Sequence, residues 1–214
     1  MPKAVSLVAL LLLAPATLSA QQPDSTDYVI LRGADTIATE RVFREGVTQR
    51  GELIVRALRN RLTIWSVVLA PDGAAALVEA TETEPPADPR FKARVLHRTR
   101  VIFKADSAAV DDVTGNGMLS NIYPTKVGAL PYLNLSVGTL ESAVRKALAA
   151  GGTDGEVALF NLGGAQTVIA TVTKTGDGAA RMQIGSVDYT ISFDGEGRVI
   201  EAAVPAQQLR MARR

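Results

Sequence analysis

The stretch VDYTISFDGEGRVIEAAVP, residues 187–205, decides the fold. In each half of it, apolar side chains occupy every second position: Val187, Tyr189, Ile191 and Phe193, then Ile200, Ala202 and Val204. Residues 194–197 between the halves are typical of a tight turn, and Pro205 ends the second half because it has no N–H for a ladder. The period of two predicts paired antiparallel strands, each with one buried and one solvated face.

The same pattern recurs outward along the chain, with Gly, Asp and Pro turn signals between short segments rich in Val, Ile and Thr. We predict strands at residues 28–32, 36–44, 52–58, 62–69, 75–83, 93–104, 157–162, 167–173, 180–184, 187–193 and 198–204. This indicates a mainly β (α+β) fold, a strongly curved antiparallel sheet or unclosed barrel of about eleven strands.

One amphipathic helix is expected on the concave side of this sheet. Thr139 is the expected N-cap, Glu141 and Arg145 are spaced to pair, and Gly151-Gly152 would end the helix. Its apolar stripe has helical spacing and comprises Leu140, Ala143, Val144, Ala147 and Leu148.

Residues 105–135 lack clear periodicity, which favours a functional flap or a poorly ordered crossover. Together with the strands and the helix, this segment could line an apolar cavity as its wall or lid. The residues that we expect there are Trp65, Tyr123, Leu130, Tyr132, Leu133, Leu140 and Val144. The alternative is that the segment simply plugs the core.

The N-terminus has the pattern of a secretory signal. Lys3 precedes an apolar run of about ten residues, and small residues lead to a cleavage site after Ala20. We therefore expect a signal peptide at 1–20, a flexible lead-in at 21–27 and a single β-rich domain at 28–214, soluble in the periplasm or outside the cell. An uncleaved anchor is the alternative. The run is too short for a transmembrane helix, and without cysteine the chain is not expected to be a lipoprotein.

Charge and composition exclude several classes of function. Once Lys3 is removed with the expected signal peptide, the chain has 22 basic and 22 acidic residues. A net charge of zero argues against a nucleic-acid partner. One histidine and no cysteine cannot build a zinc site of imidazoles and thiolates, and we expect no metal or cofactor. Asp111-Asp112 is more typical of a solvated turn than of a calcium site.

We expect no catalytic residue. His97 is the only histidine available as a base, and it is expected on an apolar strand face as a hydrogen-bonded core residue. The chain has no G-x-S-x-G elbow and no phosphate-binding loop. We therefore expect a protein that is not an enzyme, with a hydrolase based on carboxylates, or on serine and His97, as the third hypothesis.

A basic stripe is expected on the strand around residues 93–104. Its cations fall on even positions and include Arg94, Arg98 and Arg100, so an extended chain would place them on one face. Such a face could contact an anionic lipid or protein. The alternative is a solvated face that Glu79, Glu82 and Glu84 of the preceding strand neutralise.

The residues DYVILRGADTIA (27–38), YTISFDGEGRV (189–199) and VPAQ (204–207) resemble secreted bacterial domains of unknown function. These domains are similar in outline to the periplasmic lipoprotein-carrier fold, a half-barrel with a helix and a loop on its concave side. The resemblance implies an apolar ligand in the half-barrel and brings no catalytic residues.

These observations lead to a binding domain for a lipid or a lipidated protein, expected to be a monomer. The alternative is an envelope protein-interaction or assembly module that uses sheet edges and the basic strand face.

Overall fold

The computed structural model describes residues 24–56, 60–86, 88, 90–149 and 153–214. Within them, fifteen strands form one sheet, accompanied by the helix α1 (Val137–Leu148) and the short 3-10 helix η1 (Pro205–Gln207). The strands are β1 (Asp24–Arg32), β2 (Asp35–Glu45), β3 (Thr48–Val55), β4 (Arg61–Leu69), β5 (Ala75–Glu84), β6 (Arg94–Phe103), β7 (Ser107–Thr114), β8 (Gly117–Pro124), β9 (Leu130–Tyr132), β10 (Asp154–Asn161), β11 (Gln166–Gly176), β12 (Ala179–Ile184), β13 (Val187–Phe193), β14 (Val199–Val204) and β15 (Leu209–Arg213).

Strands that are neighbours in the chain are mostly neighbours in the sheet, and the sheet consists of two meanders that meet where β1 pairs with β15. Its strand order is β8-β7-β6-β5-β4-β3-β2-β1-β15-β14-β13-β12-β11-β10-β9. The first and last strands pair with each other, from Tyr28 opposite Arg213 to Arg32 opposite Leu209, which joins the two halves of the chain. Within the described residues, only β9 and β10 pair in parallel, because α1 carries the chain between them.

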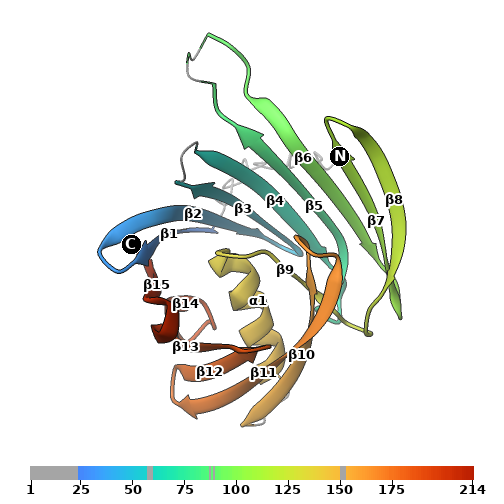
Figure 1. The fold of residues 1–214 in the computed structure, drawn as a ribbon. Coiled ribbons are helices and arrows are strands. Elements are labelled where there is room, and N and C mark those ends of the chain that lie inside the picture. The colour runs from blue at the N-terminus through green and yellow to red at the C-terminus, as the bar shows by residue number, and fades with distance from the viewer. Residues whose placement is uncertain (1–23, 57–59, 87, 89, 150–152) are drawn as a thin grey trace, which may run out of the picture.

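The sheet coils around α1, and its two ends come together (Figure 1). Leu159 and Phe160 on β10 are consecutive and both fully buried, so both faces of this strand are covered. The ring of Phe160 contacts Phe103 of β6 and Tyr123 of β8, with centroids 5.8 and 6.4 Å apart. Register shifts in several strand pairs increase the local twist that allows a sheet this wide to coil.

The expected fold class is confirmed, but the strand count and several boundaries are wrong. Residues 105–135 are not an irregular flap: they form the hairpin β7–β8 and the short strand β9. β15 was also not expected. β1 begins at Asp24, so half of the expected flexible lead-in is strand. The signal peptide at 1–20 and Gly151-Gly152 lie outside the described residues.

The ends of α1 also differ from the expectation. Ser136, not Thr139, is the N-cap, because its Oγ accepts a hydrogen bond from the Thr139 N–H at 3.3 Å. Glu141 does not form the expected helix-surface pair with Arg145. It lies fully buried and pairs with Arg44 of β2.

Candidate functional site

The residues expected around an apolar cavity lie mostly in the packed core. Trp65, Leu130, Leu140 and Val144 are each 1% exposed. The other three are half-buried: Tyr123 lies against Phe160, Tyr132 shares a hydrogen bond with Tyr189 at 3.1 Å, and Leu133 packs on the core. The concave side that they were expected to line is occupied by α1 and by β9–β10.

Trp65 occupies a slot between two glycines. A Cβ added at Gly51 of β3 or at Gly138 of α1 would overlap the indole ring, so only glycine lets the ring lie flat between strand and helix. The indole N–H donates to Glu40 Oε1 at 3.0 Å. This contact links the slot to the start of the helix.

Glu40 of β2 anchors the N-terminus of α1 from within the core. Besides the indole N–H, its carboxylate accepts hydrogen bonds from Ser136 Oγ at 2.6 Å and from the backbone N–H groups of Val137 at 2.6 Å and Gly138 at 3.2 Å. Helix N-termini carry unpaired N–H groups and favour a negative charge. Burial raises the pKa of the Glu40 carboxyl, and the four donors oppose that rise.

Glu141 fixes α1 to strands on both sides of the join between β1 and β15. Arg44 donates to it twice, from Nε at 2.9 Å and from Nη2 at 2.8 Å. The Tyr28 hydroxyl at 3.3 Å and the Val199 N–H at 3.2 Å donate to its Oε2. Burial raises the pKa of Tyr28 to about 12, so the phenol keeps its proton. α1 is therefore fixed to the sheet by two buried carboxylates.

Glu40 and Glu141 each occupy a sequence position where the period of the strand or the helix predicts a buried residue. Glu40 shares its strand face with the buried residues Ala38 and Val42. Glu141 falls on the same helical face as Val137 and Val144. From the sequence, Glu141 was expected to pair with Arg145 on the helix surface, and Glu40 was not among the expected site residues.

The expected basic stripe is interrupted. β6 begins only at Arg94, and a register shift between Glu82 and Thr83 of β5 breaks the alternation along β6. Arg94 therefore does not continue the face of Arg98 and Arg100, and it pairs with Glu84 at 2.5 Å. The Arg100–Glu79 pair, at 3.7 Å with both side chains more than half exposed, is a weak surface contact.

His97 lies at the end of the concave face, in a polar cluster. Its Nε2 is 3.0 Å from Asp112 Oδ1, and the buried Thr99 hydroxyl donates to the same oxygen at 2.8 Å. The register shift moves Val95, two residues away, off the face of β6 that carries His97. Thr99 Oγ1 also lies 3.3 Å from His97 Nε2, so the hydroxyl, the imidazole and the Asp112 carboxylate form one hydrogen-bonded cluster.

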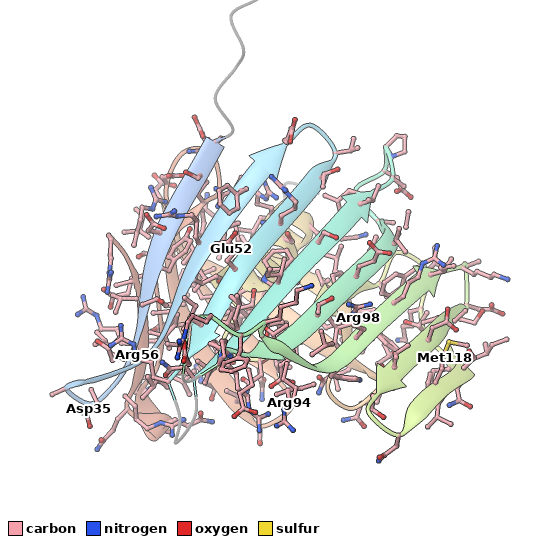
Figure 2. The ribbon with its side chains drawn as sticks, turned by 90° about the horizontal axis from the view of Figure 1, so that it is seen from above. Asp35, Glu52, Arg56, Arg94, Arg98 and Met118 are labelled. Atoms are coloured by element: carbon pink, nitrogen blue, oxygen red, sulfur yellow. The ribbon has the colours of Figure 1, made fainter. Side chains whose placement is uncertain are left out.

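The β8 strand is the most exposed apolar segment of the sheet. It lies at one end of the strand order and pairs with β7 through eight consecutive residue pairs without a bulge. Seven of its eight residues are exposed, including Met118 at 66%, Leu119 at 69% and Ile122 at 74%. Figure 2 shows Met118 at the rim of the sheet. The sequence GMLSNIYP carries no charge.

The free edge of β8 presents the backbone of alternate residues. The Thr125 N–H, which follows the strand, donates to Asp106 O at 2.9 Å, and the register continues unbroken from there to the turn. Because antiparallel ladders alternate, residues 117, 119, 121 and 123 turn their N–H and C=O toward β7. Met118, Ser120 and Ile122 therefore turn theirs to the free edge.

The other end of the sheet is protected. β9 has only three residues, and its Leu130 and Pro131 are buried. Proteins usually protect edge strands by such shortening and covering, or by charges, prolines and bulges. Apart from Pro124 at its end, β8 has none of these devices. At the end of β8, the Thr167 hydroxyl of β11 donates to Pro124 O at 3.2 Å. Within the described residues, the fold thus covers one edge and leaves most of the other open.

Two of the hollows on the surface of the described residues lie beside α1 and β8. One, of about 350 Å³, lies between the C-terminal half of α1 and the hairpin ends near Phe193; Val144, Leu148 and Phe193 give it apolar walls. The other, of about 420 Å³, lies beside β8 and is bordered by Arg98, Arg100 and Met118. Among the described residues, no helix reaches the length and apolar character that a bilayer-spanning helix needs.

These features define a mainly β protein with a coiled, unclosed sheet, one helix fixed in its concave side and one open edge. No protein-family model matches the chain, and no curated sequence matches it significantly. Among solved structures it is similar to a DUF1089 family protein from Pseudomonas aeruginosa, with a TM-score of 0.57 and 13% identity over 81% of this chain and 91% of that one.

The chain is also similar to a beta-barrel-like protein of domain of unknown function DUF1849 from Brucella abortus. There the TM-score is 0.46 and the identity 11%, over 90% of this chain and 95% of that one. At such low identity the DUF1089 likeness concerns the fold alone. It agrees with the expected β-rich domain of unknown function, whereas the outline of a lipoprotein carrier stays a prediction.

Proposed function

We propose that this chain is an exported assembly module that binds another polypeptide by adding one of its strands to the free edge of β8. The observation that carries the proposal is an eight-residue edge strand, uncharged and exposed on both faces, at the end of a sheet that protects its other edge. In this mode of recognition, main-chain hydrogen bonds supply the binding and side chains on alternate faces supply the selectivity.

The chemistry of the edge defines the class of partner. Met118 and Ile122 flank Ser120 on the convex face, and the edge offers no charge to pair with. An extended, uncharged segment with apolar residues two positions on either side of a small polar residue would fit it. Export is proposed from the signal pattern in residues 1–20.

Replacing Ile122 by proline should abolish the association without disturbing the fold. The Ile122 N–H points to the free edge, so proline removes a bond to the partner and none to β7. The measurement is crosslinking in the cell envelope, with a photo-reactive residue in place of Ser120. We expect adducts from position 120, at least about a tenfold loss of them with Ile122→Pro, and an unchanged melting temperature.

The matched control places the same photo-reactive residue at Ile64, which is 50% exposed on the convex face of β4, an interior strand. Adducts from position 120 no stronger than those from position 64 would overturn the proposal. Adducts that persist in the Ile122→Pro protein would do so too, because the contact would then not be strand addition.

A second candidate function is the binding of an apolar ligand, and the hollow beneath α1 favours it. Its volume of about 350 Å³ lies at the lower end of the range for small-molecule sites. If the hollow binds a fatty acyl chain, palmitate should raise the melting temperature, and Leu148→Trp, which fills the hollow, should remove that rise. Protein that contains no lipid by mass spectrometry and does not respond to palmitate would exclude this candidate.

A further inference from the structure

We infer that the strand added to β8 is β8 of a second copy of this chain, related to the first by a two-fold axis through Ser120. The inference rests on the proposed function and names its partner. It replaces the monomer expected from the sequence.

The backbone of the free edge is suited to pairing with itself. Met118, Ser120 and Ile122 carry the outward N–H and C=O groups. When two copies meet antiparallel with Ser120 opposite Ser120, Met118 of each copy lies opposite Ile122 of the other. Residues with outward groups then face each other at all three pairs, which is the condition for ladder hydrogen bonds.

The position of Pro124 selects this register. A pairing centred on Ser120 spans residues 117–123 and leaves Pro124 just beyond the ladder. A two-fold axis at residue 121 or 122 would bring Pro124 into the ladder at an outward position, where it lacks the N–H that a bond needs. An axis at residue 118 or 119 would bring the turn residues Gly115 and Asn116 into the pairing.

The side chains agree with the same axis. The convex face of β8 reads Met118, Ser120, Ile122, which is apolar on both sides of a small polar residue. Each Met118 therefore meets an Ile122 of the second copy, two exposed apolar side chains that cover one another. The residues in the ladder carry no charge, so two copies do not repel each other there. Asp111, the nearest carboxylate, already accepts a bond from Ser120 Oγ at 2.6 Å.

The absence of cysteine permits a direct test of this register in the otherwise native chain. In a two-fold pair, the Cα atoms of residue 120 lie about 5.5 Å apart, within reach of a disulfide. The Cα atoms of residue 118 lie about 14 Å apart, because they are four residues apart along the strand direction and one strand spacing apart across it. Ser120→Cys should therefore give at least about ten times more disulfide-linked dimer than Met118→Cys under mild oxidation.

Ile64→Cys measures disulfides formed by random collision. The inference is overturned if Ser120→Cys gives no more dimer than Ile64→Cys, or if Met118→Cys gives as much as Ser120→Cys. The photo-crosslinking experiment separates the two proposals. Adducts with a different protein that are sensitive to Ile122→Pro would leave strand addition standing and overturn self-pairing. The absence of adducts with any protein, a second copy of this chain included, would overturn the proposed function itself.

Discussion

Replacing Glu40 by alanine is expected to lower the free energy of unfolding by about 3–5 kcal/mol. The substitution leaves four buried donors without their acceptor: the Trp65 indole, the Ser136 hydroxyl and the N–H groups of Val137 and Gly138. It also opens a cavity under a fully buried side chain. Urea unfolding, followed by the fluorescence of Trp65, the only tryptophan, measures the effect.

The matched control for this substitution is Glu52→Ala. Glu52 lies on β3, the next strand of the sheet, and its side chain is exposed (Figure 2). We expect its loss to change the free energy by at most about 0.5 kcal/mol. Glutamine at position 40 should not rescue stability, because its amide N–H₂ would face other donors. A Glu40→Ala protein within about 1 kcal/mol of the native one would show that the helix does not depend on this carboxylate.

Replacing Arg44 by methionine is expected to cost about 3–5 kcal/mol as well, because it leaves the Glu141 carboxylate buried without its counter-charge. The side chains are only 13% and 0% exposed. Adding Glu141→Gln to Arg44→Met should recover a large share of the loss, since it removes the unpaired charge. A double-mutant cycle measured by urea unfolding reports the coupling between the two residues.

The chain offers a close control for the buried pair. Arg41, on the same strand as Arg44, also donates twice to a carboxylate, that of Asp27, but both side chains are about half exposed at 53% and 48%. Arg41→Met is therefore expected to cost at most about 1 kcal/mol. If Arg41→Met and Arg44→Met lowered the free energy of unfolding equally, burial would not be what makes the Arg44–Glu141 pair important for stability.

The fold class could be predicted from the sequence because most strands have one buried and one exposed face. The alternation around Tyr189 and Ala202 is an example, and the structure buries both residues. β8 lacks this signal because both of its faces are exposed, so that Met118 and Leu119 are apolar neighbours on opposite faces. β8 was therefore not among the strands predicted from the sequence.

The positions that fix the helix could not be predicted for a different reason. Charge usually indicates exposure, and the apolar residues in phase with Glu40 and Glu141 do not by themselves outweigh that indication. Their partners are remote in sequence: Ser136 is 96 residues from Glu40, and Arg44 is 97 residues from Glu141. Residues expected to line a cavity, such as Trp65, lie in the packed core, because residue type alone does not distinguish a cavity wall from packed core.

Amide hydrogen exchange along β8, measured at increasing protein concentration, tests most directly whether this edge is open and is used for association. In dilute solution, the amides of residues 119, 121 and 123 should be protected and those of residues 118, 120 and 122 should exchange freely; concentration should then protect the second set. Equal protection of both sets at every dilution, or no gain in protection on concentration, would contradict the account.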